Sequence, residues 1–288
     1  MKIKTNSFIT VILVILMLLC LAALYYQIFI DLIQDWSTDD NYSHGFFIPF
    51  ISIYMIYSIR SELGNLKIKP QNLGLLLLIA GLAQLVIGKI GSEFFVQRTS
   101  MILIFFGFSL FFLGSSFTKK NLIPILYLIL MIPLPAIVWN KIAFPMQLFA
   151  SDLTEKAIQL IGIAVFREGN ILHLAQTSLE VVDACSGLRS LTTMFALSTV
   201  IAWFATCSAP KKWLLFIAAA PIAILCNIIR LTFTAILASM YGGDVAQGFL
   251  HEFSGFVTFA LGMAMLVGIS SILTRKIKNS NVEIETIG

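Results

Sequence analysis

The chain has 288 residues, of which 58% are hydrophobic and only 12% are charged, and its formal net charge is +4. A soluble domain carries about 25% charged residues, so the composition excludes an ordinary soluble protein and indicates an integral membrane protein. A charge of +4 is ordinary for such a protein and gives no reason to expect a nucleic-acid partner.

We expect an all-α polytopic bundle of about eight transmembrane helices. The apolar runs lack the strict alternation of membrane-barrel strands, and each approaches the roughly 20 residues that a helix needs to cross a bilayer. The first run resembles a signal peptide but has no small-residue cleavage site at its end, so we expect it to remain as an anchor. This makes residues 1–288 a single membrane domain, with a transmembrane core over 8–273 and a cytoplasmic tail over 274–288. The expected spans are residues 8–30, 43–60, 72–90, 95–114, 121–139, 185–207, 213–240 and 252–273.

Lysine and arginine predict which side each loop occupies, because cytoplasmic loops are enriched in these residues. Eight spans place both termini on one side, and twelve of the nineteen basic residues fall there, so we expect cytoplasmic termini. The acidic stretch over residues 31–41 then lies outside. The twelve are Lys2, Lys4, Arg60, Lys67, Lys69, Lys119, Lys120, Lys211, Lys212, Arg275, Lys276 and Lys278; the five on the other side are Lys89, Arg98, Lys141, Lys156 and Arg167.

One further segment, residues 141–166, is long enough to span but carries Asp152, Glu155 and Lys156 at its middle. Each charge there would cost about 2.5–3.5 kcal/mol on insertion scales. We therefore expect an amphipathic helix on the outer interface. If the segment spans instead, Cys185 moves to the cytoplasmic side.

The stretch after this segment, residues 169–182, predicts a short β-hairpin, the only strand structure that we expect. Ile171, His173 and Ala175 alternate on one side of a polar turn, and Leu179 and Val181 alternate on the other. We interpret His173 as structural or peptide-contacting. The hairpin leads directly to Cys185 and would lie just above it.

Cys185 differs from the other cysteines because it opens an expected span at its outer end. Asp183 is a plausible N-cap for that helix, and Ser186 adds a second polar group at its mouth. The N–H groups of a first helical turn favour an anion and can lower the pKa of a thiol. Local context thus permits a nucleophile, but a small apolar filler is the commoner role. We assign that role to Cys20, Cys207 and Cys226.

Two arginines lie within expected spans. Arg230 is flanked by apolar residues, and an arginine in that setting indicates a functional site unless it snorkels to the interface. Asn227 lies one turn earlier on the same face and is suited to orienting the same group. Arg189 lies one turn after Cys185, where it would stabilise a thiolate, pair with an acidic residue or snorkel.

The chain has three histidines, and they lack the spacing of a metal site. His251, at the outer mouth of the last expected span, is the best-placed general base because histidine titrates near neutral pH. His44, at the outer mouth of the second, is its rival. The heights of Cys185, Arg230 and His251 along their three helices agree, so we expect them at one depth near the outer face.

Three segments in this order, "DACSGLRSL" (183–191), "NIIRLTFTA" (227–235) and "HEFSGFVTFA" (251–260), resemble the exosortase/archaeosortase family. The segment "DDNYSHGFFIP" (39–49) is similar to one typical of bacterial exosortases. The resemblance covers residues 31–273, and the Cys-Ser-Gly block is its most specific part. The chain departs from the pattern at Asp183, where many members have glutamate, and its short tail leaves no room for the extra periplasmic domain of some members.

The resemblance implies a membrane-embedded cysteine protease or transpeptidase without a cofactor, in a bacterial inner membrane with its active site at the periplasmic face. Cys185 matches the family's nucleophile, Arg230 its catalytic arginine and His251 its catalytic histidine. The implied partners are the lipid bilayer and exported proteins whose C-terminal tail combines a short motif such as Pro-Glu-Pro, a transmembrane helix and a basic cluster. The residue types leave the acceptor of the acyl intermediate open.

Two other classes of function stay open on the residues alone. In a multi-pass transporter, Arg230 and Asn227 would line a polar path, and activity would not depend on Cys185. A membrane glycosyl- or acyltransferase acting on a lipid-linked sugar would use Asp39, Asp40 or His44 as its base. A disulfide at Cys185 is disfavoured, because none of the other three cysteines is expected at the outer face.

Overall fold

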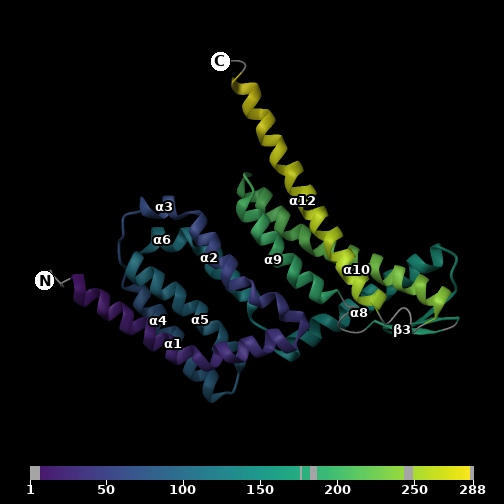
Figure 1. Cartoon of the computed structure of the whole chain (residues 1–288), viewed down its shortest axis with the longest axis horizontal. Helices are drawn as coiled ribbons and strands as arrows, with labels where there is room; N and C mark the ends of the chain where they lie inside the picture. Colours follow the sequence, from purple (N-terminus) through teal and green to yellow (C-terminus); the bar gives the residue numbers. More distant parts are fainter. Residues whose placement is uncertain (1–6, 176, 182–186, 243–248, 286–288) are drawn as a thin grey trace. The chain divides into compact units, whose positions relative to one another are not determined.

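The computed structural model describes residues 7–175, 177–181, 187–242 and 249–285 (Figure 1). Most of these residues are helical. The chain divides into two compact units, Met1–Pro133 and Leu134–Gly288. Asp183, Cys185 and Ser186 lie outside the described residues.

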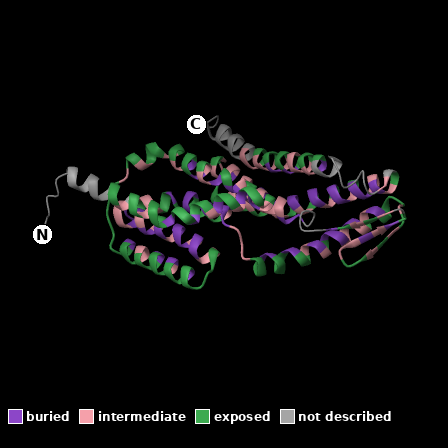
Figure 2. Cartoon of the chain, turned by 60° about the horizontal axis from the view of Figure 1, so that its bottom comes forward, coloured by how far each residue is buried: buried purple, intermediate pink, exposed green. Residues whose placement is uncertain are grey.

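The structure confirms a multi-pass membrane protein. Within the described part of the chain, five helices are long and apolar enough to cross a membrane, or six if the apolar helices flanking Pro133 form one broken span. Exposed residues follow the outward faces of the helices (Figure 2), and many are large and apolar, as expected of surfaces that face lipid. The five are Ile15–Thr38, Leu73–Ile90, Phe94–Leu113, Ala209–Met240 and Phe253–Thr274.

The count of eight spans is not confirmed, because three of the expected runs give shorter helices. The second becomes α2 (Ile48–Ser58), which has 11 residues. The fifth becomes α7 (Leu122–Tyr127) and a 3₁₀ turn, η3 (Leu128–Met131), which stops before Pro133. The sixth becomes α9 (Leu188–Phe204), a 17-residue apolar helix. Eight spans, one membrane domain and the outer-face placement remain predictions.

The first helix is longer than expected. The sequence predicts a span ending at residue 30 and an outer loop, whereas α1 (Ser7–Thr38) continues to Thr38. Asp35 lies within this extension and binds Arg98 of α5 (Phe94–Phe108), with 2.6 Å between Oδ2 and Nη2. The Arg98 side chain is only 7% exposed. A buried cation needs such a partner, and the pair explains why a helix carrying acidic residues extends here.

Close backbone approach defines the pairing of α4 (Leu73–Ile90) with α5 and the π-helical turn Ser109–Leu113 that continues it. Gly74, Gly81 and Gly88, spaced by seven residues, are buried against this partner. A Cβ on Gly81 would lie 2.7 Å from Cγ1 of Ile104, and one on Gly88 would lie 2.9 Å from the backbone N of Gln97. A Cβ on Gly74 would overlap the backbone of Phe111. Small residues of this kind allow membrane helices to pack backbone to backbone.

The second unit is arranged around α10 (Ala209–Tyr241), which contacts α8 (Ala136–Leu160), α9 and α12 (Phe249–Glu285) (Figure 1). Two apolar clusters hold it together. One joins α9, α10 and α12 through Met194, Leu215, Ala219, Ala223, Cys226 and Leu266. The other joins α8 and α10 to a small sheet through Ala150, Ile158, Leu172, Leu174, Val181, Leu231, Ala235 and Ala238.

The sheet has three antiparallel strands in the order β1 (Val165–Glu168), β2 (Ile171–Leu174) and β3 (Ser178–Glu180). The expected hairpin corresponds to β2 and β3, in which Leu172 pairs with Leu179. Leu172 and Leu174 face the core, whereas Ile171 and His173 do not. The segment "ILHL" has apolar residues on both alternating faces of the strand, and the register of strand pairing decides which face is buried. The expectation of a hairpin alone was wrong, since β1 adds a third strand.

This third strand also corrects the expected helix over 141–166. The helix begins earlier and ends at Leu160, and Gly162 follows with a φ of +88°. That left-handed conformation suits glycine and turns the chain into β1. The four residues of β1 are too few to show a strand period in the sequence.

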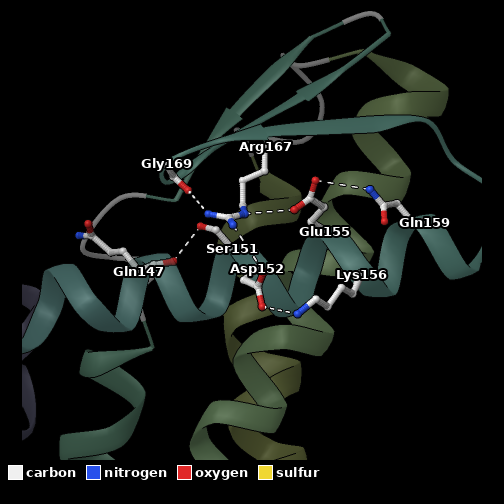
Figure 3. Close-up of polar contacts among 8 residues, drawn as sticks. All are labelled: Gln147, Ser151, Asp152, Glu155, Lys156, Gln159, Arg167 and Gly169. Atoms are coloured by element: carbon white, nitrogen blue, oxygen red, sulfur yellow. Dashed lines mark hydrogen bonds and ion pairs between the residues drawn. The ribbon is translucent and has the colours of Figure 1, made fainter.

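The charges of α8 bind an arginine of the sheet (Figure 3). Nε of Arg167 donates to Glu155 at 3.1 Å, and its Nη1 donates to the carbonyl of Gly169 at 3.0 Å. Nη2 lies 3.5 Å from Asp152, which also binds Lys156 at 2.7 Å. Arg167 therefore fastens β1 and its turn onto the charged face of α8, so these charges are compensated within the protein.

Gly74→Ala is expected to destabilise the protein, because the added methyl group meets the backbone of Phe111, which cannot rotate away. Overpacking of this kind costs about 1–3 kcal/mol. The measurement is the thermal unfolding of purified protein in detergent. Gly268→Ala is the matched control, since a Cβ there meets nothing within 4 Å in α12 and alanine favours a helix. Equal melting temperatures for the two variants would contradict the close approach.

Candidate active site

Of the Cys-Ser-Gly block, the structure describes Gly187, which directly precedes α9. Gly187 is buried and has a φ of +83°, the left-handed region that L side chains rarely adopt. Arg189 is the second residue of α9 and is half-buried. Its backbone carbonyl accepts hydrogen bonds from the hydroxyls of Thr192 and Thr193, and these bonds stabilise the first turn of α9.

Asn227 of α10 packs directly on Gly187. A Cβ on Gly187 would lie 3.1 Å from Cγ and Nδ2 of the Asn227 side chain, which is only 3% exposed. Two features therefore favour glycine at this position. One is the left-handed backbone conformation, and the other is the space that Asn227 occupies. Cys185 precedes Gly187 by two residues, so Asn227 lies beside the chain that carries it.

Arg230 lies one turn after Asn227 and is 8% exposed. Its Nη1 would lie 3.6 Å from a Cβ on Gly255 of α12. His251 lies in the first turn of α12, four residues before Gly255 and therefore about one turn away on the same face. One turn of α10 is thus in contact with the start of α9 and the second turn of α12. The three segments singled out in the sequence meet here.

Two glycines of this arrangement carry a signal that the sequence reasoning did not use. Gly187 and Gly255 each follow a serine within a proposed site segment, in "CSG" and "FSG". A glycine at such a place indicates close approach by another chain segment. The partners, Asn227 and Arg230, lie 40 and 25 residues away along the chain, and no local pattern identifies them.

A family model described as Transmembrane exosortase (Exosortase_EpsH) matches residues 36–268. The chain belongs to the transmembrane exosortase family. The match covers well over half of the chain and includes all the candidate residues, from His44 to His251. No curated protein and no solved structure gives a match. Exosortases are membrane protein-sorting enzymes, generally cysteine-dependent transpeptidases.

His44 of this exosortase lies in the first unit, in the 3₁₀ helix η1 (Asp40–Phe46). Its Nε2–H donates to the carbonyl of Leu130 at 3.1 Å, and Nε1 of Trp36 donates to the next carbonyl, that of Met131, at 2.8 Å. These carbonyls end η3, where a helix leaves its last acceptors without helical donors. The two rings therefore satisfy the end of this broken helix.

The acidic residues of the same segment also have local structural roles. The carboxylate of Asp39 accepts from the backbone N–H of Asn41 at 2.9 Å and caps η1. The carbonyl of Asp40 accepts from the hydroxyl of Ser43 at 3.1 Å. Among the described residues, no group of three histidine, cysteine, aspartate or glutamate side chains is arranged to hold a metal ion. Cys20, Cys207 and Cys226 are free thiols.

Gly187→Ala is expected to lower stability and activity together. A left-handed non-glycine residue costs about 1–2 kcal/mol, and the new methyl group also presses on the Asn227 amide. Gly162→Ala is the matched control, because its φ of +88° carries the same strain but its Cβ position is open. We expect a larger fall in melting temperature for Gly187→Ala. Equal falls would show that the contact with Asn227 contributes nothing.

Proposed function

We propose that this exosortase is a membrane-embedded cysteine transpeptidase or protease that cleaves C-terminal sorting signals of exported proteins through a thioester. The observation that supports it best is the convergence on α10. Asn227 packs on the glycine of the Cys-Ser-Gly block, and Arg230 packs on α12 one turn after His251. Cys185, Arg230 and His251 are the proposed catalytic residues. Asp183, Ser186, Arg189 and Asn227 are proposed to support them.

The residue types suit acyl transfer. The Cys185 thiolate attacks the scissile carbonyl carbon, and the carbonyl electron pair moves to its oxygen. Collapse of this intermediate breaks the C–N bond, and His251 donates a proton to the departing amine. The product is a thioester. An incoming amine, or water, then loses a proton to His251, attacks the thioester and releases the thiolate.

Arg230 is proposed to stabilise the oxyanion in both steps. Of the two arginines considered, Arg230 is buried and Arg189 is half-buried. A fixed cation removed from water stabilises developing charge more than a solvated one does, so burial favours Arg230. Asn227 is proposed to position the start of α9, because its amide fills the space beside Gly187.

For location, we propose a bacterial inner membrane with cytoplasmic termini and the active site at the periplasmic face. The distribution of lysine and arginine supports this orientation. The charged face of α8 is compensated by Arg167, which supports an interfacial position for α8 outside the hydrocarbon core. The sheet that α8 carries leads along the chain to Cys185.

The central experiment measures processing in cells that co-express a tagged protein with a Pro-Glu-Pro-type C-terminal tail. Wild type is expected to shift the mass of the tagged protein, whereas Cys185→Ala and Cys185→Ser are expected to leave it intact. Arg230→Gln is expected to lower the rate about 10²–10³-fold, since it removes one oxyanion donor. Immunoblotting of each variant in the membrane fraction controls for folding. Equal processing by wild type and both Cys185 variants would refute the thioester mechanism.

The same assay separates the two candidate histidines. His44→Gln is expected to retain processing within a few-fold, because its amide can still donate a hydrogen bond toward Leu130. His251→Gln is expected to lose about 10²–10⁴-fold, the contribution of general acid–base catalysis. The reverse result would assign the base to His44 and favour a transferase acting through the first unit's acidic segment.

A further inference from the structure

Two lysines near the start of α10 donate hydrogen bonds to its neighbours α9 and α12 at about the same position along α10. Nζ of Lys211, near the start of α10, donates to the carbonyl of Leu273 in α12 at 3.2 Å. Nζ of Lys212 donates to the carbonyl of Trp203, near the end of α9, at 3.3 Å. We call this the lysine level. It fixes how α9 and α12 are placed along α10.

The candidate active site ties the same three helices together a second time. Asn227 meets Gly187 at the start of α9, and Arg230 meets Gly255 of α12. We call this the arginine level. Both levels consist of contacts between α10 and the same two neighbours. The distance between the levels along α10 is therefore fixed by the packing of three helices.

The interval is close to the thickness of a bilayer. Nineteen residue steps separate Lys211 from Arg230 on α10, and eighteen separate Gly255 from Leu273 on α12. At about 1.5 Å per residue these steps span about 28 Å. The hydrocarbon core of a bilayer is about 30 Å thick. The α9 contacts give a shorter interval, sixteen steps from Gly187 to Trp203 or about 24 Å.

The residues at each level fit its place at a membrane boundary. Lysine ammonium groups are costly within hydrocarbon, and Trp213, beside Lys212, is 65% exposed, as tryptophans at a membrane interface are. Beyond Arg230, α10 continues to Tyr241, and its Leu231, Ala235 and Ala238 pack against α8 and the sheet. One face of this end of α10 is therefore covered, while Phe233 and Met240 on it remain exposed. Because an arginine is also costly within hydrocarbon, the boundary opposite the lysines is expected near Arg230.

We propose that this fixed interval makes the enzyme select substrates by the length of their transmembrane segment. The inference rests on the proposed function. A substrate helix lies parallel to α10 and α12, with its basic cluster in water at the lysine level. Its scissile carbonyl must then reach Arg230 at the arginine level. A segment of about 19 residues meets both conditions.

A mismatched segment misplaces the reacting carbonyl. Three residues too many or too few shift it by about 4.5 Å, more than the reach of a hydrogen bond, which is about 3 Å. A misplacement of about 1 Å can already cost on the order of 10²-fold in rate. Selection by length thus needs no side chain that recognises the transmembrane sequence.

The test uses the purified full-length chain reconstituted into lipid vesicles. The tagged substrates carry a Pro-Glu-Pro-type motif that directly adjoins transmembrane segments of about 13, 16, 19, 22 and 25 leucine and alanine residues. Processing is expected to be fastest at about 19 and to fall at least about tenfold at a difference of six. Cys185→Ala is the control for each substrate. Cys185-dependent processing at equal rates for all lengths would overturn the length selection and leave the proposed function standing. Processing of no substrate, or processing independent of Cys185, would overturn both.

A second arm separates the protein from the bilayer as the source of the selection. The same substrates are compared in vesicles of shorter-chain and longer-chain phosphatidylcholine, whose hydrocarbon cores differ in thickness. If the interval between the two levels sets the length, the optimum stays at about 19 residues in both. An optimum that moves with bilayer thickness would overturn the inference, because hydrophobic mismatch with the lipid would then be sufficient.

Discussion

The burial of a guanidinium group within the apolar stretch of α10 is the constraint on which the second unit depends. Arg230 is only 8% exposed, and a Cβ added to Gly255 of α12 would lie 3.6 Å from its Nη1, an ordinary contact distance. Asn227, one turn away, packs more tightly on Gly187 just before α9, where an added Cβ would lie 3.1 Å from its amide. Two polar side chains on successive turns of α10 thus contact the start of α9 and the second turn of α12. The apolar cluster around Cys226 and Met194 then fills the space below them.

Long apolar runs made α4, α5, α10 and α12 predictable, because length and apolarity alone identify a helix that can cross a membrane. Cys185, Arg230 and His251 were predicted to lie at one depth, and this stays a prediction. The described parts of the three segments meet at Gly187, Asn227, Arg230 and Gly255. The sequence prediction of a common depth came from counting residues along each helix from a common boundary.

The features that sequence reasoning missed depend on partners distant in the chain. The extension of α1 carries Asp35, whose partner Arg98 lies 63 residues later. The charges of α8 led to the expectation of an interfacial helix, but their binding by Arg167 of β1 was not predicted. His44 resembled a base at a helix mouth, but its Nε2–H donates to a carbonyl of η3. These contacts could not be predicted for one reason, since each polar residue was assessed without the distant group that compensates it.

The three glycines of α4, spaced by seven residues, have a consequence for insertion of the protein into the membrane. Helices whose backbones touch at Gly74, Gly81 and Gly88 leave no gap for an acyl chain, so α4 and α5 expose only their outer faces to lipid. The connection between them is only residues 91–93. Such a pair is suited to leave the insertion machinery as one preassembled hairpin, with Gln97 and the backbone carbonyl of Gly88 already bonded to each other. The buried polar groups of α5 would then never face the bilayer alone.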